Sequence, residues 1–205
     1  MAIERVAVIG SGVMGAGIAA QCANAGLSVM LLDIVIARAD DRCSLSKDAV
    51  QRQLKSGGFM SPEFAERIDV GNLEDDLDKL SDADWIVEVV VEDLAIKREL
   101  YERIDPMRKP GAVVSSNTST LRLQQLSEGM SEGFRRHFMI THFFNPPRHM
   151  RLLELVGSPE TDTEALEQVF ECCDKTLGKG VVHCKDTPGF IANRIGVYWL
   201  MAAVH

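Results

Sequence analysis

Two ionisable side chains, His142 and Glu154, stand in apolar stretches only twelve residues apart. His142 lies in the run FMITHFF, and Glu154 interrupts the run MRLLELV. An imidazole titrates near neutral pH and can take a proton from a hydroxyl group, and a nearby carboxylate orients it and stabilises its protonated form. Because a buried carboxylate without a partner is costly, the two residues are expected to meet. The alternative is that each is a satisfied group of the core or of a strand end.

The other four histidines are weaker candidates for a general base. His137 and His205 lie in charged or terminal contexts, His149 in a loop, and His183 on a short strand near a lysine. Only His142 lies on an apolar strand that runs towards the expected ligand edge of the sheet. We therefore predict that His142 is the base and that Glu154 is its partner.

A glycine-rich turn near the start of the chain is typical of dinucleotide binding. In VAVIGSGVMGAG, Gly10, Gly12 and Gly15 follow a strand and open a helix that begins with Val13 and Met14. The first glycine permits the tight turn, the second lets the backbone approach a pyrophosphate, and the third allows close packing of helix on strand. The free N–H groups and the positive end of the helix attract the phosphates. The alternative is a turn that binds no ligand.

Asp33 stands where NAD-binding proteins hold the adenosine ribose. It ends the second predicted strand, about 20 residues after the turn, so its carboxylate can accept the ribose hydroxyls. A carboxylate there repels the 2′-phosphate of NADP, and NAD is therefore the expected cofactor. The alternative is an exposed aspartate at a strand end. The nicotinamide would supply hydride chemistry, and His142 would manage the proton.

The elements that must position these residues alternate along the chain. The pattern predicts strands at 5–10, 27–33, 67–72, 84–91, 112–118, 138–144 and 150–156, and helices at 13–24, about 37–55, 94–105, 122–128 and 161–177. Such alternation implies parallel strands joined by helical crossovers. The expected fold class is α/β, with a Rossmann-type doubly wound, mostly parallel sheet and helices on both faces.

The final segment, TPGFIANRIGVYWLMAAVH, predicts one more helix, opened by Thr187 and Pro188 as N-cap and first residue. Its apolar residues go nearly all the way round, so it is expected to be buried on several sides. We expect residues 1–186 to form the dinucleotide-binding domain and residues 187–205 to begin a helical C-terminal domain, in a longer protein of which this chain is the first part.

Composition bounds the remaining possibilities. The 205 residues are 46% hydrophobic and 25% charged, as in ordinary globular proteins. The net charge of −8 argues against general affinity for nucleic acid or anionic membranes. The five cysteines follow no metal-ligand spacing and are an odd number, so we expect reduced thiols in a cytoplasmic protein and no metal site. Neither a signal peptide nor an apolar run of membrane-spanning length is expected.

Five motifs in order make the sequence similar to a known family. GSGVMGAGIA, VEVVVEDLAIK, SSNTST, THFFNPP with MRLLELV, and KDTPGFIANR together resemble the NAD-binding domain of L-3-hydroxyacyl-CoA dehydrogenases. They look most like the long bacterial form, in which an enoyl-CoA hydratase-like region follows. The likeness covers nearly the whole chain apart from about residues 38–66. It implies oxidation of (S)-3-hydroxyacyl-CoA to 3-ketoacyl-CoA with NAD, as in fatty-acid β-oxidation, by a homodimer formed through the C-terminal domain.

The resemblance also implies roles for single residues. It makes His142 the catalytic base and Glu154 its orienting carboxylate, with Ser119 and Asn193 as the active-site serine and asparagine. Positions near the cofactor fall on Asp33, Glu92, Lys97, Ser119 and Asn145.

Three of these residues could instead have purely structural roles, and the role of one neighbouring residue is open. Ser119 could cap the helix before LRLQQL, Lys97 could be a solvated helix residue, and Asn193 could cap an internal gap. Arg148 could meet a CoA phosphate or face solvent.

Two rival functions are also compatible with the sequence. One is a 3-hydroxyacid dehydrogenase acting on a free acid; such enzymes usually employ a lysine base, and NTSTLRLQQL offers no lysine. The other is a non-catalytic NAD-binding module, which would have been free to lose His142, Glu154, Ser119 and Asn193.

Overall fold

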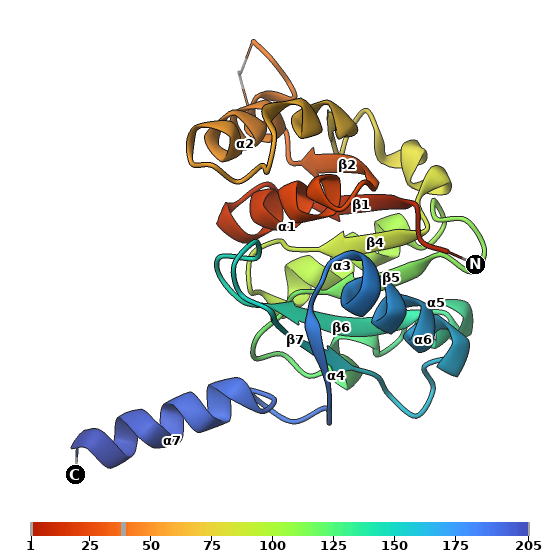
Figure 1. The fold of residues 1–205 in the computed structure, drawn as a ribbon. Helices are drawn as coiled ribbons and strands as arrows, with labels where there is room; N and C mark the ends of the chain where they lie inside the picture. Colours follow the sequence, from red (N-terminus) through yellow and green to blue (C-terminus); the bar gives the residue numbers. More distant parts are fainter. Residues whose placement is uncertain (1, 38–39, 205) are drawn as a thin grey trace.

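A computed structural model describes residues 2–37 and 40–204 of the protein (Figure 1). Its strands are β1 Arg5–Ile9, β2 Ser28–Asp33, β3 Ile68–Asn72, β4 Trp85–Glu88, β5 Val113–Ser116, β6 Phe138–Phe143, β7 Leu152–Val156 and β8 Gly180–Cys184. Its α-helices are α1 Val13–Asn24, α2 Ser44–Lys55, α3 Leu94–Ile104, α4 Leu123–Ser127, α5 Glu132–Arg136, α6 Thr163–Glu171 and α7 Ala192–Val204. Two 3₁₀ helices, η1 Pro62–Arg67 and η2 Leu77–Asp82, and one π-helical turn, η3 Cys172–Thr176, complete the described elements.

All eight strands form one sheet in the order β3-β2-β1-β4-β5-β6-β7-β8. Each neighbouring pair is parallel except β6 and β7, which are antiparallel. The chain builds outward from β1 to β3 and then returns to place β4 on the other side of β1. The strand order therefore reverses between β1 and β4, and ligands of such sheets bind outside the carboxyl ends at this switch point. The predicted Rossmann-type, mostly parallel fold is confirmed.

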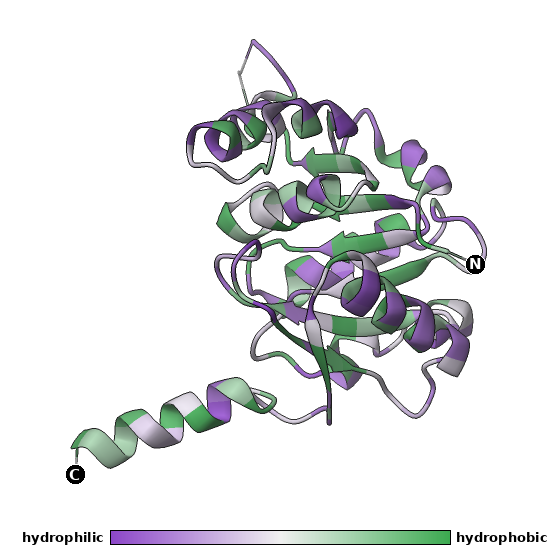
Figure 2. Ribbon diagram, in the orientation of Figure 1, coloured by the Kyte–Doolittle hydropathy of each residue, from purple (hydrophilic) through white to green (hydrophobic). Residues whose placement is uncertain are grey.

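Alternate residues of each central strand enter two separate apolar layers. In β1, Val6 and Val8 pack towards α1, α2 and α6, whereas Ala7 and Ile9 pack towards α3, α4 and α5. A strand with helices on both faces must be apolar at nearly every position, which explains runs such as VAVI. Figure 2 shows the strands mostly in the hydrophobic colour, with hydrophilic residues more frequent on helices such as α2 and α6. This two-sided core makes the sheet a rigid support for its carboxyl edge.

The predicted strands lie within a few residues of their expected bounds, but two helix predictions need correction. The helix expected from about residue 37 begins only at Ser44. The Asp41 carboxylate accepts a hydrogen bond from the Cys43 amide in the turn before it; residues 38 and 39 of the prediction lie outside the described residues. The helix expected over 161–177 is α6, capped by Asp162, followed by the π-helical turn η3. The short strand expected around His183 is β8, and α5 had not been expected.

The last helix also begins later than predicted. Thr187 does not cap it: α7 starts at Ala192, after Gly189 and Phe190, which have φ of 73° and 45°. Such left-handed backbone interrupts a helix, and the true cap comes from Glu154 on β7, as described below. Figure 1 shows α7 extending away from the sheet, and none of its described residues is buried. The prediction that it is buried on several sides is therefore not met within this chain.

The helices of the described ranges include none with the length and apolar character needed to cross a membrane.

Candidate active site

A cleft of about 420 Å³ lies at the carboxyl edge of β4, β5 and β6. It brings together seven of the residues that the sequence singled out: Met14, Glu92, Lys97, Ser119, His142, Asn145 and Asn193. Val89, Val90, Asn117, Phe143 and Phe144 complete its lining. These residues come from α1, α3 and the end of β6, from the segments after β4, β5 and β6, and from the start of α7. Parallel strands end at one edge of a sheet, which is how segments so far apart in the sequence meet here.

His142 and Glu154 meet across the antiparallel pair of β6 and β7, where they are direct register partners. His142 Nδ1 lies 2.8 Å from Glu154 Oε2, and the two residues are 7% and 1% exposed. Burial alone would raise the pKa of the Glu154 carboxyl, but the hydrogen bonds from His142, Ala192 and Ile191 together lower it. The carboxylate is therefore ionised at neutral pH, and Nδ1 of the imidazole carries the proton that it accepts.

This bond leaves Nε2 of His142 as the ring nitrogen available to a ligand in the cleft. The ring lies beside Phe144 and Phe190, with centroid distances of 4.5 Å and 5.7 Å. These two aromatic neighbours restrict the orientation of the ring and limit its contact with water. The arrangement is that of a general base with a fixed tautomer and orientation.

The other oxygen of Glu154 holds the amino end of α7. Oε1 accepts hydrogen bonds from the amides of Ile191 and Ala192, at 2.9 Å and 2.8 Å. A helix leaves its first N–H groups without internal partners, and a carboxylate there acts as a cap. Because Asn193 follows at once, the same side chain that orients His142 also places Asn193 at the cleft. The Asn193 side-chain amide donates to the Ser119 carbonyl at 3.4 Å, so the alternative of an internal gap-filling residue is not what the structure shows.

Ser119 lies on the loop between β5 and α4, with its side chain on the cleft. It does not cap α4, because the N-cap position is Arg122 and the Asp186 carboxylate accepts from the amides of Leu123 and Gln124. The alternative role of Ser119 as a helix cap is therefore wrong. Glu92 accepts from the Ser119 amide at 3.1 Å and connects this loop to the segment after β4.

Lys97 is not the solvated helix residue that was one alternative. It is 1% exposed, and its ammonium group lies 2.6 Å from Glu88 Oε1 and 3.4 Å from Glu92 Oε2. Glu88, at the end of β4, was not singled out from the sequence. Its carboxylate also accepts from Tyr101 Oη and Ser116 Oγ, at 2.7 Å and 2.6 Å. The burial of Tyr101 and the neighbouring Glu88 charge raise the pKa of the Tyr101 phenol, which therefore stays a neutral donor.

The glycine-rich turn has the shape that a dinucleotide pyrophosphate requires. Gly10 has φ of 102°, and a Cβ on Gly15 would lie 1.8 Å from the Gly10 carbonyl oxygen, so neither position tolerates a side chain. A Cβ on Gly12 would meet nothing within 4 Å and would project into open space. In the described part of the chain no side chain caps α1, so the N–H groups of its first turn are left for a ligand. These features fit a bound NAD, and the turn residues and Met14 would hold its phosphates.

Asp33 lies beside this turn, as predicted for a ribose ligand, and Ser11 fixes its orientation. Its Oδ2 accepts from the Ser11 amide at 2.6 Å and from Ser11 Oγ at 2.5 Å. Its Oδ1 accepts from the Ile34 amide at 2.7 Å and keeps capacity for a further donor. Arg52 donates to the Ser11 carbonyl at 3.1 Å, which holds the turn against α2.

The segment after β6 is fixed by two cations. Arg148 Nη1 donates to the carbonyls of Gly57 and Phe59, so this side chain ties the segment to the loop that follows α2. Lys179, which is buried, donates to the carbonyls of Pro147 and Met150. Asn145, which lines the cleft, begins this segment with a cis peptide bond to Pro146.

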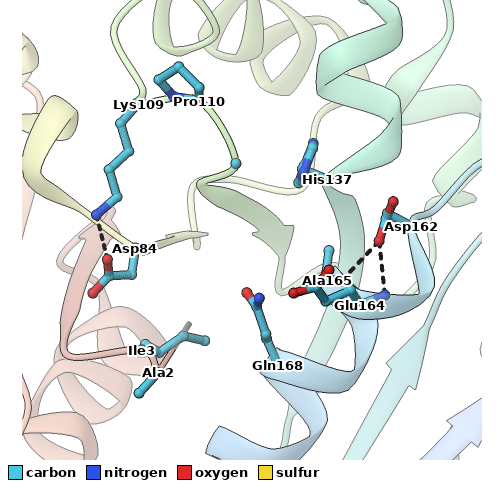
Figure 3. A pocket seen from close by; sticks show the side chains of 11 residues that line it. Ala2, Ile3, Asp84, Lys109, Pro110, His137, Asp162, Glu164, Ala165 and Gln168 are labelled. Carbon is cyan, nitrogen blue, oxygen red and sulfur yellow. Dashed lines mark hydrogen bonds and ion pairs between the residues drawn. The ribbon is translucent and has the colours of Figure 1, made fainter.

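A second cavity, of about 230 Å³, lies at the opposite, amino edge of the sheet (Figure 3). It is lined by residues that precede β1, β4, β5 and β6 and by α6, and it contains no residue predicted to act in catalysis. Its main charged pair is structural: the Asp84 carboxylate binds Lys109 (Figure 3). The same carboxylate accepts hydrogen bonds from the amides of Glu4 and Arg5. The residues predicted to act in catalysis instead line the cleft at the carboxyl edge.

Comparison with known proteins agrees with this geometry. Residues 5–187 match the family model "3-hydroxyacyl-CoA dehydrogenase, NAD binding domain". The chain is 49% identical to the probable 3-hydroxyacyl-CoA dehydrogenase of Deinococcus radiodurans over 206 residues, which are 100% of this chain and 60% of that protein. It is 47% identical to the putative fatty acid oxidation complex trifunctional enzyme of Rickettsia felis over 200 residues, 97% of this chain and 28% of that protein. Among solved structures, FadB2 of M. tuberculosis has a TM-score of 0.84 at 32% identity, over 100% of this chain and 71% of that chain.

The chain thus spans less than two thirds of the length of both curated relatives. The family match nevertheless includes the glycine-rich turn, the Ser119 loop and the His142–Glu154 pair. The doubly wound sheet and the glycine-rich turn agree with this match, and the chain belongs to the 3-hydroxyacyl-CoA dehydrogenase family, whose NAD-binding domain corresponds to residues 5–187.

Proposed function

We propose that the protein interconverts (S)-3-hydroxyacyl-CoA and 3-ketoacyl-CoA with NAD, as a dehydrogenase of fatty-acid β-oxidation. The observation that carries this proposal is the 2.8 Å bond between His142 and Glu154 in the cleft that Ser119 and Asn193 also line. A buried, oriented base is needed to remove a proton from an alcohol, and a module that only binds NAD has no use for it. The relatives from D. radiodurans and R. felis support the substrate class and the pathway.

The residues of the cleft divide the chemistry among them. Bound NAD supplies the acceptor for the hydride from C3 of the substrate. His142 Nε2 takes the proton of the 3-hydroxyl, and Glu154 stabilises the imidazolium that forms. Ser119 Oγ and the Asn193 amide hydrogen-bond the oxygen as it becomes a carbonyl, which favours the transition state over the alcohol. In the reverse direction His142 returns the proton to the same oxygen.

A dehydrogenase that uses a lysine base on a free 3-hydroxy acid fits this cleft less well. Lys97 is the lysine that lines the cleft in the described structure, and its ammonium group is already paired with Glu88. Lys97 Nζ already donates a hydrogen bond at 2.6 Å to the buried Glu88 carboxylate, so it is not placed to take a proton from a substrate.

The direct test follows NADH oxidation by absorbance with acetoacetyl-CoA as substrate, in the complete protein. We expect turnover with the CoA thioester and little or none with free acetoacetate. Turnover of the free acid alone would replace the proposal with the free-acid dehydrogenase. NADH binding without turnover of either compound would favour a non-catalytic module.

Three further properties belong to the same proposal. The five cysteines are free thiols, which supports a cytoplasmic location. The exposed apolar side chains of α7, including Tyr198, Trp199 and Leu200, support the view that residues 187–205 begin a helical domain. We propose that this domain completes the acyl-CoA site and forms a homodimer.

A further inference from the structure

One carboxylate holds the loop that carries Ser119. Glu92 Oε1 accepts hydrogen bonds from Thr118 Oγ1 at 2.5 Å, from the Ser119 amide at 3.1 Å, and from the Thr120 amide and hydroxyl at 3.2 Å and 2.9 Å. Burial alone would raise the pKa of the Glu92 carboxyl, but these bonds and the Lys97 charge lower it, so it acts as an anion. Four donors on one oxygen leave the loop little freedom, while the Ser119 hydroxyl is left to the cleft.

Glu92 is in turn positioned by the buried ion pair of Lys97 and Glu88. Lys97, on α3, lies 3.4 Å from Glu92 Oε2 and 2.6 Å from Glu88 Oε1. Glu88 is fully buried and also accepts from Ser116 Oγ, whose oxygen accepts from the Thr118 amide at 3.3 Å. Two routes therefore join the rigid end of β4 to the loop: one through Lys97 and Glu92, and one through Ser116.

We propose that Glu92 is a positioning residue that sets the place of the Ser119 hydroxyl, and that Glu88 and Lys97 set the place of Glu92. This positioning role is separate from the cofactor contact that the family resemblance implies for Glu92 and Lys97, and one carboxylate can serve both. The inference rests on the proposed function for the claim that the position of Ser119 affects turnover. The claim that Glu92 orders the loop is independent of the proposed function.

The physical reason is that a hydroxyl stabilises a developing carbonyl oxygen only at the correct distance. A displacement of about 1 Å costs on the order of 10²-fold in rate. A loop at the end of a strand has no such precision by itself. Glu92 supplies it because both loop amides and both threonine hydroxyls depend on one charged acceptor, and charged acceptors form the stronger hydrogen bonds.

The test compares Glu92→Ala, which removes the acceptor, with Glu92→Gln, which keeps a carbonyl oxygen at the same place. We expect Glu92→Ala to lower kcat, measured at saturating NADH, by about 10- to 100-fold. Glu92→Gln should recover most of the loss, because an amide oxygen still accepts from the loop. In a Ser119→Ala background, Glu92→Ala should cause little further loss, since its effect passes through Ser119. Glu99→Ala, an exposed carboxylate of α3, is the matched control.

Two kinetic outcomes would overturn the inference. A kcat at saturating NADH that keeps its wild-type value in Glu92→Ala, with only the Kd for NADH raised, would leave Glu92 a cofactor contact alone. Independent losses from Glu92→Ala and Ser119→Ala would show that Glu92 does not act through Ser119.

Amide hydrogen exchange tests the loop without any need for turnover. Glu92→Ala should speed exchange at the Ser119 and Thr120 amides about tenfold, with Glu92→Gln between it and the wild type and β6 unchanged. Unchanged exchange would refute the ordering role, even if acetoacetyl-CoA proved not to be a substrate. Fast exchange in a protein that does not turn over would support the ordering role and refute the proposed function separately.

Discussion

His142 and Glu154 face each other as register partners across β6 and β7, and one carboxylate of that pair serves two parts of the site. Glu154 Oε2 orients the imidazole, and Oε1 caps the segment that leads into α7. The orientation of the base and the position of Asn193 are therefore set by a single buried side chain on β7. A change at Glu154 must alter both, whereas a change at His142 alters only the base.

His142→Gln should remove the base and little else. The glutamine side chain is of similar length and polar, so the Glu154 carboxylate keeps a donor. We expect kcat to fall by about 10² to 10⁴-fold, which is the range for loss of a general base. The Kd for NADH, measured by fluorescence titration, should stay nearly unchanged, because the pyrophosphate and ribose groups are held at the glycine-rich turn.

The control is His183→Gln, on β8, where the ring stacks on Phe170 away from the cleft. It should retain full turnover. An unchanged kcat in His142→Gln would remove this residue from the mechanism.

Glu154→Gln should change how stability depends on pH. The pKa of Glu154 lies below its ordinary value of 4.5, so the ionised carboxylate stabilises the folded state above about pH 4.5. That contribution is lost as the pH falls through the lowered pKa. The variant should be less stable by about 1–3 kcal/mol at neutral pH, and the difference from wild type should shrink in acid.

Urea unfolding of both proteins over a series of pH values measures this difference. Glu160→Gln, an exposed carboxylate paired with Arg135 at the surface, is the control and should show a much smaller effect. A difference between wild type and Glu154→Gln that stayed constant from neutral to acid pH would contradict the assigned pKa shift.

Much of this site could be predicted because its signals are local. The spacing of Gly10, Gly12 and Gly15 fixes a turn between a strand and a helix, and the structure has α1 at the predicted 13–24. His142 and Glu154 could be paired because each interrupts an apolar strand and the two strands follow one another. Their meeting is confirmed by the structure, whereas their catalytic roles stay predictions.

Two features could not be predicted because they depend on distant partners. Thr187 and Pro188 give a good local signal for a helix start, but the acceptor that caps α7 is Glu154, far away in the sequence. Glu88 was missed inside the run WIVEVVV, although a carboxylate in such a run needs partners. Lys97 and Tyr101, four residues apart on one face of α3, were the available signal.

Asp33→Asn should shift the choice of cofactor. The carboxylate repels a 2′-phosphate, while an asparagine amide keeps an oxygen for Ser11 and adds a donor. We expect the ratio of NADH to NADPH affinity to fall by about tenfold or more, measured as two Kd values by fluorescence. Asp69→Asn, which makes the same charge change on β3, should leave the ratio unaltered. A ratio that did not move in Asp33→Asn would mean that the ribose does not reach Asp33.

Two single-methyl changes in the glycine-rich turn should separate folding from cofactor binding. In Gly12→Ala the new Cβ meets nothing within 4 Å, and φ of −62° suits alanine, so the thermal midpoint should stay near that of wild type. The methyl nevertheless projects where the pyrophosphate must approach, and the Kd for NADH should rise about tenfold or more.

In Gly15→Ala the Cβ would lie 1.8 Å from the Gly10 carbonyl oxygen, which α1 can relieve only by moving off β1. That variant should lose about 1–3 kcal/mol of stability, as overpacked sites do, and bind NADH poorly for that reason. Normal NADH binding by a fully folded Gly12→Ala protein would show that the pyrophosphate does not lie on this turn. Normal stability of Gly15→Ala would show that α1 and β1 are not packed as closely as the structure has them.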